Sequence, residues 1–255
     1  MGVVIDHPIE VFVLALIALA IASRAGVAIS KRRAMDTGTR EDFAVIQAAT
    51  LTLLGLIIGF SFSMAISRYD ARKTYEEEEA NAIGTEYLRA GLLPATDADQ
   101  VRGLLARYLD QRIQLYRTHD AMHLREIEAE TARLQAALWA AVQTPAAAQP
   151  TPVVALAVSG MNDVINAQGY TQAAWRNRIP GAAWVLLFMI AACGNLMVGY
   201  AMHGRRILGT LHVLLPLVIA LSFMLIADID SPRGGFIHVE PLNLKSLAAS
   251  LPAPR

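Results

Sequence analysis

The sequence predicts an all-α membrane protein with four transmembrane helices and a helical extramembrane domain inserted between spans two and three. The first supporting observation is composition: the mean hydropathy is +0.39, and only 17% of the 255 residues are charged. An ordinary soluble domain has about 25% charged residues. Because this chain has too little polar surface to cover a globule in water, part of its apolar surface must face lipid.

The second observation is a set of four apolar runs, each long enough to cross a bilayer, which requires about 20 helical residues. The predicted spans are Ile9–Ile29, Phe43–Ser67, Ile179–Met202 and Ile207–Ala227. The first carries Glu10 and Arg24, so Arg24 must reach an interface or point into protein. The predicted divisions are 1–67 (two spans and a short basic loop), 68–178 (helical domain), 179–227 (two spans) and 228–255 (extended tail).

Helical patterning dominates residues 68–178. Arg68 to about Leu93 continues the second span, with Glu76–Glu79 as a solvated acidic band. Two further helices each show apolar residues on one face. These residues are Val101, Leu104, Leu105, Tyr108 and Leu115 in one helix and Leu124, Ile127, Leu134 and Leu138 in the next. We expect Thr144–Pro152 to be a Pro/Ala linker, followed by a fourth helix from Val153.

Basic residues give little information on orientation. Seven lie in or near the two short loops: Arg24, Lys31, Arg32, Arg33, Arg40, Arg205 and Arg206. Six flank the opposite ends of the spans: Arg68, Arg72, Lys73, Arg176, Arg178 and Arg233. The positive-inside rule, applied to seven against six, places the short loops in the cytoplasm and the helical domain outside.

Composition and motifs argue against several function classes. The 22 basic and 22 acidic residues cancel, which argues against a nucleic-acid partner. The sequence contains no Walker-type loop, dinucleotide glycine fingerprint, Gly-x-Ser-x-Gly elbow or paired cysteines. We therefore expect no enzymatic activity and no cofactor.

One group has metal-ligand spacing. His119, His123 and Glu126 would share a helical face at i, i+4 and i+7, which a zinc or manganese site could use. The alternative is an ordinary solvated face. A metal-dependent enzyme built on this face is the third of the functional hypotheses.

The second span contains a stripe of small residues at every fourth position: Gly55, Gly59, Ser63 and Ser67. In lipid, such a stripe lets helices approach closely, either within one chain or around an axis between subunits. Phe60 and Phe62 project elsewhere on the helix, and a ring of such residues would form a hydrophobic constriction that gates by dewetting.

Charged residues follow two of the spans. After the second span come Arg68, Asp70 and Arg72, which would be interfacial anchors. If the second spans ring an axis, Arg68 would lie at the exit of the span. After the fourth span come Asp228 and Asp230, before a Pro/Gly turn. These two carboxylates could bind a hard cation or belong to an ordinary turn.

Three segments together resemble the bestrophin-like family of bacterial membrane proteins. Leu54–Arg89 resembles the family's second span and the helix that leaves it. Ala173–Phe188 resembles the entry into the third span, and Ala227–Leu242 resembles the motif after the membrane. The resemblance covers most of Phe43–Leu242, with the same order and spacing of the pieces.

By analogy with true bestrophins, the resemblance implies a pentameric channel with a cytosolic helical domain, opposite to the charge bias. It places Phe60 and Phe62 at the pore neck, Tyr69–Arg72 at the polar exit and Asp228–Gly234 in a calcium-binding stretch. The leading hypothesis is a multi-pass, homo-oligomeric channel of the cytoplasmic membrane that passes small ions along the second spans. The alternative is a membrane-anchored sensor or adaptor whose helical domain binds a protein partner, with no pore.

Overall fold

The computed structural model describes residues 6–32, 35–202 and 211–252. Within these residues all regular structure is helical, which agrees with the predicted all-α class. The chain forms two compact units. The first unit comprises Met1–Tyr69 and Arg178–His238, and the second comprises Asp70–Asn177 and Val239–Arg255. Helix α3, Thr37–Arg89, has 53 residues and contributes to both units.

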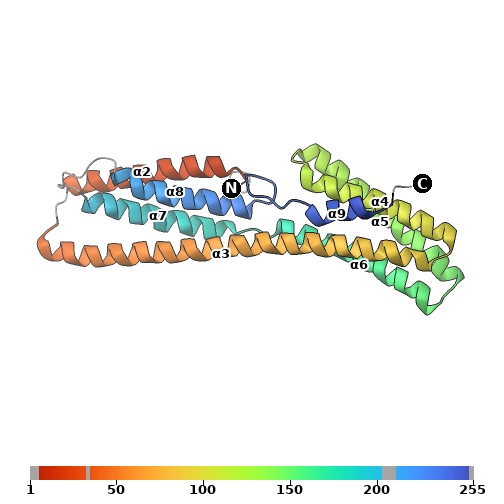
Figure 1. The fold of residues 1–255 in the computed structure, drawn as a ribbon. Coiled ribbons are helices and arrows are strands. Elements are labelled where there is room, and N and C mark those ends of the chain that lie inside the picture. The colour runs from red at the N-terminus through yellow and green to blue at the C-terminus, as the bar shows by residue number, and fades with distance from the viewer. Residues whose placement is uncertain (1–5, 33–34, 203–210, 253–255) are drawn as a thin grey trace. The chain divides into compact units, whose positions relative to one another are not determined.

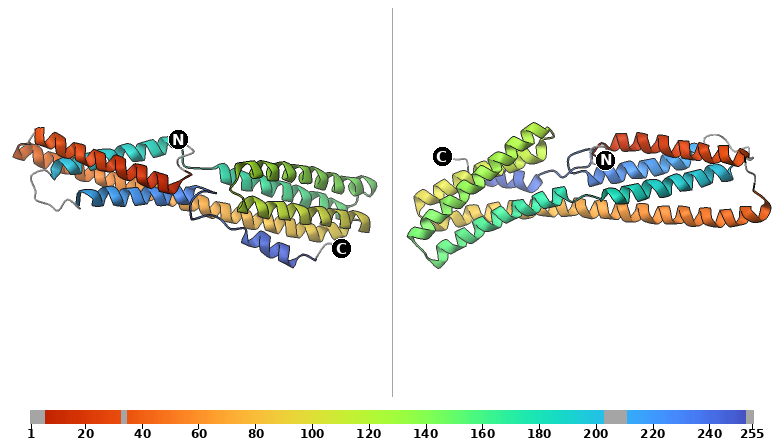
Figure 2. Two further views of the ribbon diagram at one scale, coloured as in Figure 1. Left: turned by 90° about the horizontal axis from the view of Figure 1, so that it is seen from above. Right: turned by 180° about the vertical axis from the view of Figure 1, so that it is seen from behind.

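In the first unit, α2 (Pro8–Arg32), α7 (Gly181–Ala201) and α8 (Leu211–Asp230) run alongside the first part of α3 (Figures 1 and 2). Four helical segments are long and apolar enough to cross a membrane. They are Pro8–Arg32, Gly38–Leu92, Pro152–Ala201 and Val213–Asp230. The predicted start of the fourth span at Ile207, and the basic residues Arg33, Arg205 and Arg206, lie outside the described residues.

Helices α2 and α7 approach closely because glycines lie where they cross. A Cβ atom on Gly26 of α2 would overlap the carbonyl oxygen of Leu196, and one on Gly199 of α7 would overlap that of Ser23. Between these positions the two backbones leave no room for a side chain. In lipid, such contacts hold helices together because close packing, not hydrophobic expulsion, drives their association.

Aromatic side chains fill the rest of this core. The ring centroids of Phe188 and Phe223 are 4.8 Å apart, and those of Trp184 and Phe223 are 6.1 Å apart, both pairs edge to face. Trp184 and Phe223 are buried in the apolar cluster that joins all four helices of the unit. Edge-to-face packing is a favoured geometry for aromatic pairs.

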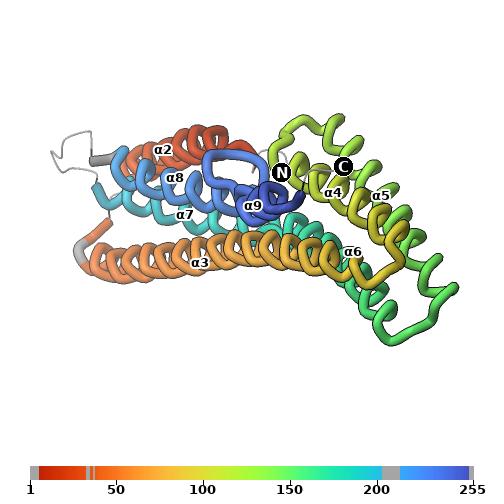
Figure 3. The backbone as a smooth tube through the Cα atoms, turned by 45° about the vertical axis from the view of Figure 1, so that its right-hand side comes forward, coloured from red at the N-terminus to blue at the C-terminus, as the bar shows by residue number. Residues whose placement is uncertain are grey.

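The second unit contains the rest of α3, the short 3-10 helix η1 (Ala90–Leu92), α4 (Ala95–Arg117), α5 (Ala121–Ala148) and α6 (Pro152–Arg176). Short turns make α4, α5 and α6 consecutive packed neighbours (Figure 3). The predicted face of α4 is confirmed, and Ile127, Leu134 and Leu138 of α5 are buried as predicted. The predicted linker Thr144–Pro152 is wrong in extent, because α5 continues through Pro145 to Ala148.

The tail is not extended throughout, contrary to the prediction for 228–255. Helix α8 continues to Asp230, and residues Leu242–Ser250 form α9, which packs against α4. The buried Glu76 fixes the start of α9. Its Oε1 accepts from the Leu244 backbone N–H at 2.9 Å, and its Oε2 accepts from Asn243 Nδ2 at 2.7 Å. A carboxylate satisfies the free N–H groups of a helix N-terminus and favours its dipole.

The expectation that Glu76–Glu79 is a solvated band is wrong for its two end residues. Glu76 and Glu79 are 1% and 0% exposed, whereas Glu77 and Glu78 face solvent. Glu79 forms a bidentate pair with the buried Arg112 of α4, in which Nη2 donates to Oε2 at 3.2 Å. The Thr171 hydroxyl of α6 lies 3.0 Å from the same oxygen. Burial is tolerated because each charge has a partner.

The glycine contact between α2 and α7 generates a stability prediction. Gly199→Ala should lower the free energy of unfolding by about 1–3 kcal/mol, because the added methyl group must push the two backbones apart. Thermal unfolding in detergent measures the change. The matched control is Gly181→Ala at the start of the same helix, where a Cβ atom meets nothing within 4 Å. Equal stability of the two variants would contradict the close contact.

Candidate functional site

The small-residue stripe of α3 lies on open surface of the described chain. Gly55, Gly59, Ser63 and Ser67 are all exposed. A Cβ atom added to Gly55 or Gly59 would meet nothing within 4 Å. The structure therefore does not place these glycines against another described helix of the same chain.

The packed face of the same span lies on the other side. Leu54, Ser61 and Ala65 are 3%, 6% and 0% exposed. Since each residue turns a helix by about 100°, these positions lie roughly opposite the stripe. The span therefore has one face packed into its own unit. Its opposite face is exposed and carries the small residues of the stripe.

Phe60 and Phe62 lie on different sides of this helix. Phe60 is 62% exposed. Phe62 is half-buried and packs against the apolar cluster of the first unit. The structure thus leaves Phe60 available to line a surface outside the chain, whereas Phe62 contributes to the internal packing of its unit.

The three residues predicted at the pore exit have different surroundings. Arg68 Nη1 lies 3.8 Å from Asp230 Oδ1. Asp70 is exposed, three residues after Ser67. Arg72 is 1% exposed, within the second unit. Asp70 is therefore the member of this group whose side chain faces solvent.

Asp228 and Asp230 organise the junction after α8. The carboxylate of Asp228 accepts from the backbone N–H groups of Phe236 at 2.7 Å and Ile237 at 3.2 Å. Asp230 is 1% exposed and accepts from the Ile179 N–H at 3.0 Å, just before α7. Backbone donors thus occupy carboxylate oxygens that were predicted to be cation ligands, and cation binding at this pair stays a prediction.

Gly235 is required where this junction turns. It has a φ of +80°, and a Cβ atom there would overlap Asp228 Oδ1. The positive φ is accessible to glycine at little cost. This close approach lets the chain after α8 fold back and present its N–H groups to the carboxylate.

The predicted metal-ligand face is wrong. Helix α4 ends at Arg117 and α5 begins at Ala121, so His119 lies in the intervening turn and not on one helix with His123 and Glu126. His123 Nδ1 lies 3.2 Å from Glu126 Oε2, and both side chains are exposed. Across the described ranges, no group of three or more His, Cys, Asp or Glu residues is placed to hold a metal ion.

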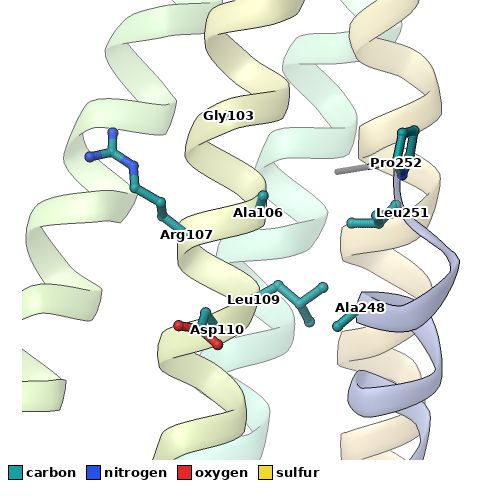
Figure 4. Close-up of a pocket in the computed structure, with 8 residues that line it drawn as sticks. All are labelled: Gly103, Ala106, Arg107, Leu109, Asp110, Ala248, Leu251 and Pro252. Carbon is teal, nitrogen blue, oxygen red and sulfur yellow. The ribbon is translucent and has the colours of Figure 1, made fainter. Parts of the chain in front are cut away.

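A pocket of about 490 Å³ lies between α4 and α9 in the second unit. Leu109 of α4 points toward Ala248 and Leu251, whereas the side chain of Arg107 points away (Figure 4). The pocket is lined by Gly103, Ala106, Arg107, Leu109, Asp110, Ala248, Leu251 and Pro252. It is mainly apolar, with no converging set of catalytic groups.

Buried ionisable groups cluster around the Glu79–Arg112 pair. Burial, reinforced by the negative charge of Glu79, raises the pKa of Tyr108 and of Tyr116, so both phenols stay neutral. Burial alone would lower the pKa of Arg112, but the Glu79 carboxylate more than offsets this and holds it above its ordinary value. Arg112 therefore keeps its charge at any physiological pH, which suits a structural connection and not proton transfer.

Sequence reasoning missed this charged core, although a signal was present. Arg72, Glu76, Glu79 and Glu86 follow one another at helical spacing, together with the apolar Ile83. Charges that share a face with an apolar residue can indicate a buried polar network. This spacing is easily missed when Glu76–Glu79 is interpreted as one continuous run of four glutamates.

The family comparison covers nearly the whole chain. A family model described as the Bestrophin-like domain matches residues 12–244. Among curated proteins, none matches the chain.

Solved structures of a bacterial bestrophin homolog from Klebsiella pneumoniae have a similar fold. One, of a tryptophan-to-alanine variant, is 14% identical, with 94% of this chain and 93% of that chain covered and a TM-score of 0.66. A second from this organism is 16% identical, with 96% and 99% covered and a TM-score of 0.63. A structure described as a membrane protein with a leucine-to-alanine substitution is 17% identical, with 93% and 99% covered and a TM-score of 0.60.

The matched residues 12–244 include all three segments on which the resemblance in the sequence rests: the second span with the helix that leaves it, the entry into α7 and the junction after α8. The four long apolar helices and the fold agree with this match. The chain is therefore a helical membrane protein that belongs to the Bestrophin-like family.

Proposed function

We propose that this protein is a homo-oligomeric, channel-like protein of the cytoplasmic membrane that passes small ions along an axis lined by α3. The observation that carries the proposal is the open stripe of Gly55, Gly59, Ser63 and Ser67, opposite the packed face of the same span. Small, weakly polar residues on a bare helix face suit both a close helix–helix approach and a wet axis. Five copies is the number that the family resemblance implies.

Membership in the Bestrophin-like family supports a channel over an enzyme or an adaptor. The adaptor alternative would use exposed apolar side chains of the second unit, such as Leu88, Met122 and Tyr170, which are 75%, 67% and 58% exposed. In a homo-oligomer, neighbouring copies could cover the same side chains. Whether the detergent-purified protein is a ring or a monomer therefore separates the two hypotheses.

Phe60 is the residue that we propose for the constriction. It is the large apolar side chain next to Gly59, and 62% of it is exposed. A ring of phenylalanines would leave a dry passage, which resists ions because they cannot shed their hydration shell cheaply. Phe62 is the second residue of the predicted neck. It is half-buried and has packing partners in its own unit, so it is tested separately from Phe60.

Disulfide cross-linking tests whether the stripe faces another copy. In a Cys193→Ser background, which removes the single exposed thiol, Ser63→Cys should give covalent dimers in membranes after mild oxidation. Ser61→Cys is the matched control, because it makes the same change two residues away at a position that is 6% exposed. Gel electrophoresis without reductant measures the dimer. Equal cross-linking of both variants, or none in either, would contradict the proposed axis.

Ion flux tests the constriction. Phe60→Ala should raise the flux of small ions through liposomes several-fold over the parent protein, because the passage widens and wets. The control is Met189→Ala on α7, where 58% of the side chain is exposed on a helix away from the stripe. Phe62→Ala should change flux less than Phe60→Ala. If neither parent nor Phe60→Ala passes any small ion, and the protein is monomeric, the channel proposal is wrong and the adaptor hypothesis takes its place.

Ion preference tests the role of Asp70. Rings of acidic side chains favour cations, so Asp70→Asn should lower the cation preference, measured as a shift of reversal potential across a salt gradient. Asp99→Asn on α4, also an exposed aspartate, is the control and should leave the preference unchanged. Arg68 is unsuitable for this test because it pairs with Asp230. An unchanged reversal potential in Asp70→Asn would place Asp70 away from the ion path.

A further inference from the structure

Glu86 of α3 is a buried carboxylate whose surroundings differ from those of Glu76 and Glu79. Its side chain is 0% exposed, and among the described residues neither Oε1 nor Oε2 has a hydrogen-bond partner. Glu76 accepts two hydrogen bonds at the start of α9, and Glu79 is paired with Arg112. Of the three carboxylates on this face, Glu86 is the one to which no residue that the structure describes donates.

Helix α6 packs directly on this carboxyl group. A Cβ atom on Gly160 would overlap Glu86 Oε2 and would lie 2.6 Å from Arg89 Nη1. Gly160 is itself buried. The close fit of α6 on α3 at this point therefore depends on Gly160 of α6 and on the protonation state of Glu86 of α3.

Charged groups on α3 and on the helices that contact it have partners of their own. Arg89 Nη1 lies 3.6 Å from Asp163 Oδ2 of α6. On α4, Arg102 Nε donates to the Tyr87 carbonyl at 3.3 Å, and on α9, Lys245 lies 3.7 Å from Glu240.

A carboxylate without a donor is costly to bury, so the neutral acid is favoured at this site. Burial raises the pKa of Glu86 to about 8, with Arg89 acting against the rise and Asp163 adding to it. The group therefore carries its proton at neutral pH and loses it in mildly alkaline solution.

We propose that Glu86 is a proton-operated switch that sets how tightly α6 packs on α3 within the second unit. In the neutral state the carboxyl group fills the space beside Gly160, and Arg89 stays with Asp163. The ionised carboxylate requires a donor, and the nearest sources are the Arg89 guanidinium and water. Moving Arg89 breaks its pair with Asp163, and admitting water separates the two helices at Gly160. This proposal is independent of whether the protein conducts ions.

The direction of the pH dependence follows from the two protonation states. The pKa of Glu86 in the folded chain, about 8, lies above its ordinary value of 4.5, so the folded chain holds a proton that the unfolded chain releases between these values. The contribution of Glu86 to stability is therefore fully present below about pH 4.5 and is lost as the pH rises through about 8.

Hydrogen exchange of the full-length protein in detergent tests the switch. After correction for intrinsic rates, amides of α6 around Gly160 should exchange several-fold faster at about pH 9 than at about pH 6. In Glu86→Gln, which keeps the size of the side chain but cannot ionise, this difference should be lost. Glu77→Gln, an exposed position on the same helix, is the matched control and should keep it.

Two results would overturn the proposal. One is that the exchange of α6 amides does not depend on pH in the wild type, or that it depends on pH equally strongly in Glu86→Gln. The other does not depend on how the variant folds. Infrared spectroscopy of the wild type at about pH 6 should show the carbonyl stretch of a protonated carboxyl group, which fades toward about pH 9. If that band is missing at about pH 6, Glu86 is already ionised and cannot act as the switch.

Discussion

Helix α3 runs without interruption from Thr37 to Arg89, and both compact units are built on it. This continuity imposes a constraint: a single helix must meet two environments with one packed face in each. In the first unit, the packed positions are small or apolar, as at Leu54 and Ala65. That choice follows from lipid, where a buried polar group without a partner is costly. In the second unit the packed face carries charges, and α4, α6 and α9 supply their partners.

The two buried carboxylates Glu76 and Glu79 each have partners on other helices. Glu76 fixes the start of α9 through two donors, and Glu79 holds α4 through Arg112 and lies beside Thr171 of α6. Two neighbouring turns of α3 thus determine where three other helices attach. Replacing such a network by apolar residues is often neutral, but removing one partner leaves a buried charge and costs about 3–5 kcal/mol. The contacts of this network therefore position three helices, and a net gain in stability does not follow from them.

The parts of the fold that depend on local periodicity were predictable from the sequence. Long apolar runs and the buried faces of α4 and α5 follow from hydrophobic spacing, which needs no knowledge of partners. Two of the failures involve partners that are distant in the chain, whereas the misplacement of His119 has a local cause. The acidic band looked solvated because Arg112 lies 33 residues from Glu79. Helix α9 was missed because the four prolines of the tail indicated an extended chain, whereas Glu76, 168 residues from Leu244, supplies the cap. His119 was misplaced because Asp120 starts a new helix by accepting from the His123 N–H.

The glycines of the first unit show the same limit at the candidate site. Gly26 and Gly199 are required because another backbone occupies the space of a Cβ atom, whereas Gly55 and Gly59 face open space. In the sequence the two pairs cannot be told apart, since each lies in an apolar helix among small residues. A glycine with no close neighbour still exposes backbone and costs about 1 kcal/mol relative to alanine in a helix. Within the described chain, no close contact accounts for Gly55 and Gly59, and the proposed contact with a second copy of α3 is what would account for them.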